Sequence, residues 1–140
     1  MFMERKILGR VFGPQREQFE AHQGRIVLQS TVDELGKDHP FTALVPDLSG
    51  GMDPDDAFSK IPYEKGFYFL YHLQTLVGGA EKFEPFMRAY IDNFALRTVT
   101  TGAFKAYLLE HFPDCTALRE LDWDTWLYTP GVPLRFLLLN

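Results

Sequence analysis

Residues 61–77 read IPYEKGFYFLYHLQTLV and carry apolar side chains around nearly the whole circumference of a helix. Pro62 suits the first turn of a helix, and Gly78-Gly79 directly after the stretch provide a stop. A helix that is apolar on every side has to be buried. We therefore expect residues 61–77 to form the central helix of the fold.

Two amphipathic helices are predicted before this stretch. The first covers residues 2–12 and ends at Gly13-Pro14, and the second runs from Pro14 to Leu35, where Gly36 follows as its stop. No side chain suited to capping precedes the helix at 2–12, which is the pattern expected of a chain cut inside a longer helix. Gly24 is a weak point within the second helix.

Three further helices are predicted after the central one. Residues 80–94 and 100–112 each place their apolar side chains on one stripe, and a short helix near the C-terminus is capped by Asp122 and ended by Pro130-Gly131. No internal repeat and no extended β-alternation is visible. The sequence thus predicts an all-α fold of about five to seven helices.

The stretch from about residue 37 to residue 60 has no helical or strand period. It contains three prolines, Gly50-Gly51 and five aspartates, together with apolar residues such as Phe41 and Leu44 that can pack it against a core. Irregular loops longer than about 12–15 residues are usually functional or disordered. We expect this loop to form the wall of a cavity.

Composition limits the classes of function. The 140 residues are 46% hydrophobic and 24% charged, as in one folded domain, and the 15% of aromatic residues is a large apolar load that suggests missing partners. The net charge is −5 and basic residues are scattered, which argues against nucleic acid. Cys115 is the single cysteine, so a cytoplasmic setting is expected. No apolar run approaches a membrane span, so no membrane partner is expected.

The chain holds no complete catalytic constellation of its own. Its four histidines are His22, His39, His72 and His111. They show neither an i,i+4 pair nor an H-E-x-x-H string, which are the helical patterns that bind zinc. Gly50-Gly51 has no following lysine, so it is not a phosphate-binding loop. We therefore expect the chain itself to bind no metal.

Three strings are specific enough to indicate a family. They are DHPFTALVPDLSGGMDPDDAF at 38–58, IPYEKGFYFLYHLQTLVGG at 61–79 and DWDTWLYTPGVP at 122–133. In this order and at these separations they resemble the zinc aminopeptidases of the leukotriene A-4 hydrolase type, which are thermolysin-like metallopeptidases. The resemblance covers residues 1–133 and implies the helical lobe of the catalytic domain, leaving 134–140 as a non-matching apolar tail.

The resemblance also implies what lies outside the chain. In this family the H-E-x-x-H motif and the third zinc ligand, in an N-E-G string, lie just upstream of a segment like MFMERKILGRVFG, residues 1–13. The full-length enzyme would contain zinc, whereas this fragment would bind none and would be inactive alone. Its partners would be a peptide substrate and the missing N-terminal and C-terminal parts of its own enzyme.

Within the fragment, the resemblance implies that Tyr63 is the catalytic phenol. A protonated phenol held at a helix start can donate a hydrogen bond to the oxyanion that forms when zinc-bound water attacks a peptide carbonyl. From the residues alone, a packing tyrosine is the alternative. The family match also implies a substrate pocket formed by Pro46, Leu48, Pro54, Ala57 and Phe58.

Asp55 matches the aspartate that, in the bifunctional family member, directs water onto a carbocation derived from a lipid epoxide. A turn or N-cap carboxylate explains the D-P-D-D string equally well. Phe58 stands where the bifunctional enzyme has tyrosine, so the match favours the aminopeptidase over the epoxide hydrolase activity. A non-catalytic helical module that binds other proteins is the alternative for the whole chain.

Overall fold

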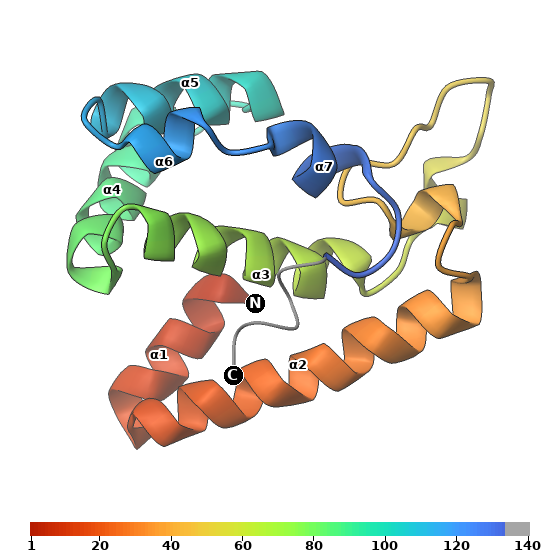
Figure 1. The fold of residues 1–140 in the computed structure, drawn as a ribbon, viewed down its shortest axis with the longest axis horizontal. Helices are drawn as coiled ribbons and strands as arrows, with labels where there is room; N and C mark the ends of the chain where they lie inside the picture. The colour runs from red at the N-terminus through yellow and green to blue at the C-terminus, as the bar shows by residue number, and fades with distance from the viewer. Residues whose placement is uncertain (134–140) are drawn as a thin grey trace. The chain divides into compact units, whose positions relative to one another are not determined.

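The structure is a computed structural model that describes residues 1–133, and every regular element in this range is a helix (Figure 1). The predicted all-α fold is confirmed, and the tail at 134–140 lies outside the described residues. The chain divides into two compact units, one made of Met1–Leu70 and the segment from Asp122 onward, the other of Tyr71–Leu121. Helix α3 (Ile61–Leu76) begins in the first unit and ends in the second.

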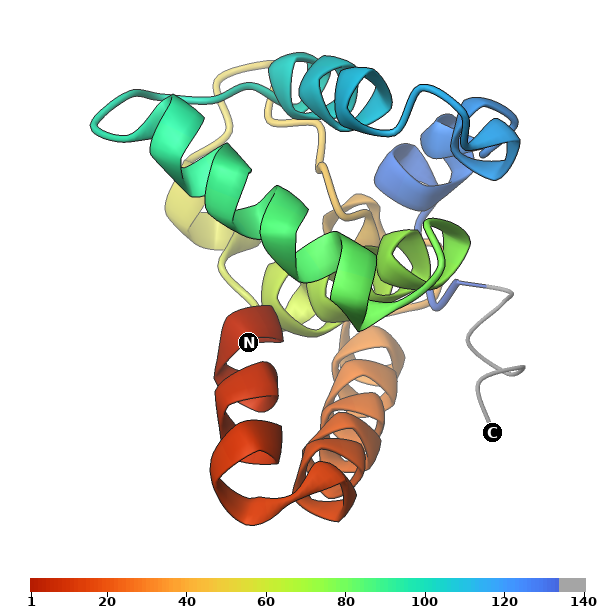
Figure 2. The ribbon, with the colours of Figure 1, turned by 90° about the vertical axis from the view of Figure 1, so that its left-hand side faces the viewer.

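Helices α1 (Phe2–Phe12) and α2 (Pro14–Leu35) form a hairpin in the first unit and lie side by side in both views (Figure 1, Figure 2). Gly13 joins them with a φ of 95°, a left-handed conformation that favours glycine, and Pro14 starts α2. Gly36 ends α2 with a φ of 100°. Both helix boundaries predicted from these glycines are confirmed.

The buried face of α1 differs from its apolar pattern. Phe2 and Arg5 are its buried residues, whereas four apolar side chains of the pattern are exposed: Met3, Ile7, Val11 and Phe12. Phe2 packs on Phe67 of α3 with ring centroids 6.1 Å apart. The spacing therefore predicted the helix correctly but not the face that it turns towards the core.

The irregular loop after α2 contains two short 3-10 helices, η1 (Pro40–Thr42) and η2 (Pro54–Ala57). Its first half is attached to the core, because Thr42 is buried and the Val45 amide donates to the carbonyl of Leu127 at 2.8 Å. Its second half is open, with the Phe58 side chain 76% exposed. The loop lies where the sequence places it, but only its first half is packed.

Helix α7 (Trp123–Tyr128) completes the core of the first unit. As predicted, Asp122 caps it by accepting a hydrogen bond from the Thr125 amide at 3.0 Å. The Phe69 ring of α3 packs against Trp123 and Trp126, with centroids 5.5 and 5.3 Å away. The aromatic residues of two distant segments thus form one cluster.

The second unit contains α4 (Ala80–Phe94), α5 (Thr101–His111) and α6 (Thr116–Arg119). Phe86 is fully buried, and six aromatic rings lie with centroids 5.3 to 6.2 Å from its own: Phe83, Tyr90, Phe104, Tyr107, His111 and Phe112. Phe83 is buried as well, and the other rings around Phe86 are half-buried or exposed. The four-residue α6 was not predicted, since so short a helix has no readable period.

Within residues 1–133, no helix is long and apolar enough to span a membrane.

Candidate active site

Three consecutive side chains at the start of α3 lie in very different environments. The helix begins where the Ser59 hydroxyl accepts a hydrogen bond from the Ile61 amide at 3.2 Å. Tyr63 is 44% exposed, whereas Glu64 is 4% and Lys65 1% exposed. Successive residues point about 100° apart around a helix, so these three side chains leave the first turn in separate directions.

Glu64 forms a buried ion pair with Arg5 of α1. The Arg5 Nη2 atom donates to Glu64 Oε2 at 2.6 Å, and the two side chains are 3% and 5% exposed. The guanidinium carbon of Arg5 also lies 4.1 Å from the centre of the Phe67 ring. Arg5 Nε and Nη1 have no hydrogen-bond partner among residues 1–133, so Glu64 is the acceptor on which this buried cation depends.

Gly24 of α2 makes room for this ion pair. A Cβ atom at this position would collide with both Arg5 Nη2 and Glu64 Oε2. Next to it, the Tyr68 hydroxyl donates to the Ala21 carbonyl of α2 at 2.6 Å, and burial raises the pKa of Tyr68 to about 12. The apparent weak point of α2 is therefore a place where side chains of α1 and α3 lie directly against the backbone of α2.

Replacing Gly24 with alanine is expected to lower the free energy of unfolding by about 1–3 kcal/mol, because the added methyl group forces the buried ion pair apart. Denaturant unfolding followed by circular dichroism measures this change. Gly102→Ala is the matched control, since Gly102 lies in α5 with its nearest neighbour 3.9 Å from a built Cβ atom. It should gain up to about 1 kcal/mol from helix propensity. Equal effects of the two substitutions would contradict the packing argument.

Lys65 is buried, and no carboxylate of residues 1–133 pairs with it. Its Nζ atom donates to the carbonyl oxygens of Thr42, Thr129 and Gly131 at 2.9, 2.8 and 2.9 Å. Burial lowers the pKa of Lys65 to about 8, while three carbonyl acceptors favour the charged ammonium form. Neither of the two charged residues that follow Tyr63, Glu64 and Lys65, is therefore solvated, although both stand at the start of a helix. Their position within an apolar run is the signal that could have indicated burial.

The Tyr63 side chain extends from the first turn of α3, which Glu64 and Lys65 anchor to the core. Among the residues that the structure describes, its hydroxyl makes no hydrogen bond. A packing tyrosine would be mostly buried, whereas nearly half of Tyr63 is accessible. The hydroxyl is thus free to donate to a group that comes from outside the described chain.

Asp55 lies in η2, within the open half of the loop. The N-cap of η2 is Asp53, whose Oδ1 atom accepts from the Asp55 amide at 3.0 Å. The Asp55 side chain is exposed, and no hydrogen bond to its carboxylate is present in residues 1–133. Its carboxylate is therefore available for chemistry, and the capping role that the sequence left open for Asp55 belongs to Asp53.

The five residues predicted to line a substrate pocket lie in the same loop. Pro46 and Ala57 are half-buried, while Leu48, Pro54 and Phe58 are exposed. With three of its five members exposed, this stretch is an accessible surface in the described chain. The cavity wall expected from the sequence stays a prediction.

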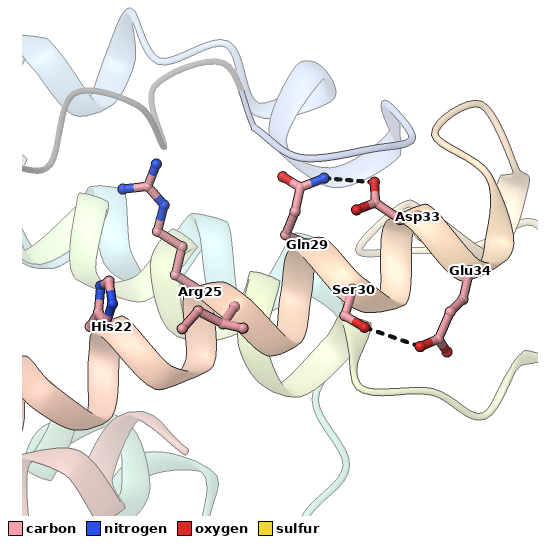
Figure 3. A pocket seen from close by; sticks show the side chains of 7 residues that line it. His22, Arg25, Gln29, Ser30, Asp33 and Glu34 are labelled. Atoms are coloured by element: carbon pink, nitrogen blue, oxygen red, sulfur yellow. Dashed lines mark hydrogen bonds between the residues drawn. The ribbon is translucent and has the colours of Figure 1, made fainter.

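A groove of about 650 Å³ lies elsewhere, along the surface of α2 (Figure 3). Its polar lining residues are partly bonded to one another: Gln29 donates to Asp33 at 2.8 Å and Ser30 to Glu34 at 3.0 Å. None of the predicted site residues lines it. The groove is an open helix face and brings together no catalytic combination of side chains.

The described part of the chain contains no metal centre. Among residues 1–133, no three histidine, cysteine, aspartate or glutamate side chains lie close enough together to hold an ion. Catalytic zinc needs three protein ligands. Residues 1–133 therefore do not by themselves provide a donor set that fits a zinc ion.

Comparison with known proteins places this arrangement in a family. The model of the "Peptidase family M1 domain" matches residues 1–126. The chain belongs to peptidase family M1. Peptidases of family M1 are in general zinc-dependent, and the lack of a fitting donor set in residues 1–133 means that these residues do not hold the metal by themselves.

Relatives within family M1 match almost the whole chain. It is 48% identical over 137 residues to leucine aminopeptidase 2 of Aspergillus terreus, covering 95% of this chain and 22% of that protein. Leucine aminopeptidase 2 of Saccharomyces cerevisiae is 41% identical over 136 residues, covering 96% and 20%. The native yeast LTA4 hydrolase structure superposes with a TM-score of 0.90 at 42% identity, covering 96% and 22%. The chain thus spans about a fifth of the length of these relatives.

Proposed function

We propose that this chain is the helical part of a zinc-dependent aminopeptidase catalytic domain and that it supplies the transition-state tyrosine, Tyr63, with one wall of the substrate site. The observation that carries the proposal is the environment of Tyr63. Tyr63 is nearly half exposed and its hydroxyl makes no hydrogen bond within residues 1–133, while the two residues after it are anchored in the core. The names of the relatives support an aminopeptidase acting on the N-terminal residues of peptides.

The chemistry of Tyr63 would be hydrogen-bond donation. Hydrolysis of a peptide bond passes through a tetrahedral intermediate whose oxygen becomes negatively charged. A donor that is already oriented towards this oxygen stabilises the transition state more than the ground state. The metal ligands would come from parts of the enzyme outside this chain, and the open 46–58 surface would then be covered by the substrate and by those parts.

A second activity, hydrolysis of a lipid epoxide, is supported by one observation. The Asp55 carboxylate is exposed and unbonded within residues 1–133, so it could orient a water molecule. The similar solved structure is that of a yeast LTA4 hydrolase.

We also infer a cytoplasmic location for the enzyme, which the free thiol of Cys115 supports.

A hybrid enzyme tests the proposal. Residues 1–133 replace the matching segment of the yeast leucine aminopeptidase 2, and the rate of leucine release from a peptide substrate is compared with that of the unaltered yeast enzyme. Because the chain is 41% identical to the yeast enzyme over 136 residues, we expect kcat within about tenfold of the yeast enzyme. A hybrid that folds and binds zinc but releases no leucine would favour the alternative, a non-catalytic helical module that binds other proteins.

A further inference from the structure

The Lys65 ammonium has all three of its N–H donors engaged. An ammonium group can donate three hydrogen bonds, and the acceptors of Lys65 are the carbonyl oxygens of Thr42, Thr129 and Gly131, each within 2.9 Å. These acceptors belong to two segments of the chain, η1 in the loop and the stretch after α7. Lys65 therefore attaches the first turn of α3 to both segments at once.

The two segments whose carbonyl oxygens accept from Lys65 are also joined to each other by a hydrogen bond. The Gly131 amide donates to Thr42 Oγ1 at 2.8 Å, and Thr42 Oγ1 in turn donates to the His39 carbonyl at 2.7 Å. Thr42 is fully buried. The hydrogen bonds from Gly131 to Thr42 and from Thr42 to His39 thus help to hold the carbonyl oxygens around Lys65 in place.

Glu64, the residue before Lys65, anchors the first turn of α3 on a different side of the helix. Glu64 is bound to Arg5 of α1, beside Gly24 of α2. Two anchors about 100° apart determine the rotation of a helical turn about its axis. The direction in which the Tyr63 side chain leaves the turn depends on that rotation, because no hydrogen bond within residues 1–133 holds its hydroxyl.

We propose that Lys65 is a positioning residue for Tyr63, and that it acts by binding the carbonyl oxygens of Thr42, Thr129 and Gly131. Lys65 itself does not reach the substrate, since it is 1% exposed. Its effect on the reaction passes through the direction of the Tyr63 phenol. This inference rests on the proposed function of Tyr63.

A double-mutant cycle in the hybrid enzyme tests this role. Lys65→Met keeps an unbranched side chain that is one atom shorter and removes its donors, so we expect kcat to fall by about tenfold or more while KM stays within about twofold. In the Tyr63→Phe background the same substitution should cost less than about twofold, because no hydroxyl remains to be misplaced. Thermal unfolding of all four proteins shows whether they are folded at the assay temperature.

Two outcomes separate the inference from the function on which it rests. If Lys65→Met lowers kcat equally in both backgrounds, Lys65 does not act through Tyr63 and the inference is overturned, while the proposed function stands. If Tyr63→Phe alone changes kcat by less than about threefold, the proposed function fails and the inference fails with it.

A matched pair of variants at Thr42 covers the case in which Lys65→Met does not fold. Thr42→Val removes the hydroxyl that accepts from Gly131 but keeps the shape, and Thr42→Ser keeps the hydroxyl. We expect Thr42→Val to lower kcat only when Tyr63 is present and Thr42→Ser to stay close to the unaltered hybrid. A loss with Thr42→Val that is the same in the Tyr63→Phe background would overturn the inference.

A spectroscopic measurement on the 140-residue chain needs no activity. With 3-fluorotyrosine at position 63, we expect one sharp fluorine resonance in the unaltered chain and a shifted or broadened one in Lys65→Met. The same label at Tyr107, in the Tyr71–Leu121 unit, should not respond. An unchanged resonance at position 63 would overturn the proposed positioning role.

Discussion

Tyr63→Phe in the hybrid enzyme is expected to lower kcat for leucine release by about 10²–10³-fold and to leave KM nearly unchanged. The loss corresponds to about 2.7–4 kcal/mol, the usual effect of removing one hydrogen-bond donor to an oxyanion. Phenylalanine keeps the ring, so substrate binding and packing should persist. Because only the hydroxyl is removed, the loss should fall on the transition state and not on the ground state. Steady-state kinetics on purified hybrids measure both constants.

Asp55→Asn is the matched comparison for the Tyr63 variant. Both residues are exposed, Asp55 in the loop and Tyr63 at the start of α3. An aspartate that only directs water onto an epoxide is, however, dispensable for the hydrolysis of peptides. Asp55→Asn should therefore keep most of the peptidase kcat. If Tyr63→Phe keeps more than about a third of kcat, Tyr63 is a packing residue and its catalytic assignment is wrong.

The second large effect is expected on stability. Glu64→Ala in the 140-residue chain should lower the free energy of unfolding by about 3–5 kcal/mol, because it leaves the Arg5 guanidinium buried without a carboxylate. Arg5 has few alternatives, as two of its nitrogen atoms already have no partner among residues 1–133. Urea unfolding at neutral pH, followed by circular dichroism, measures the loss.

Two controls distinguish the buried charge from a general effect of losing a glutamate. Glu20 pairs with Arg16 at 2.6 Å on the surface of α2, so Glu20→Ala should cost only about 0.3–0.5 kcal/mol. The double variant Arg5→Leu with Glu64→Leu should recover much of the Glu64→Ala loss, because apolar pairs often replace buried ion pairs at little cost. A Glu64→Ala loss no larger than that of Glu20→Ala would contradict the described ion pair.

The helices themselves were predictable because their boundaries depend on short-range signals. Gly13-Pro14 and Gly36 ended or started helices at the predicted places, and Asp122 capped α7 as expected. Such signals work within three or four residues and need no knowledge of the rest of the chain. The motif around Tyr63 was also readable, since family membership depends on the order of residues and not on their contacts.

The face of α1 and the burial of the charged residues were not predictable in the same way. Arg5 and Glu64 are 59 positions apart, and the Lys65 acceptors are 23, 64 and 66 positions away from it. The acceptors of Lys65 are backbone carbonyls, which every residue possesses, so no residue type in the sequence marks them.

The sequence by itself determined the α-helices other than the four-residue α6, their order and the family motif that contains Tyr63. The tertiary structure alone decided that Tyr63 is accessible, whereas Glu64 is anchored on Arg5 and Lys65 on three backbone carbonyl groups. The physical reason is the range of the interactions. Helix signals act between near neighbours, whereas the partners of Glu64 and Lys65 come together only when α1, α2, the loop and the segment after α7 pack around the start of α3.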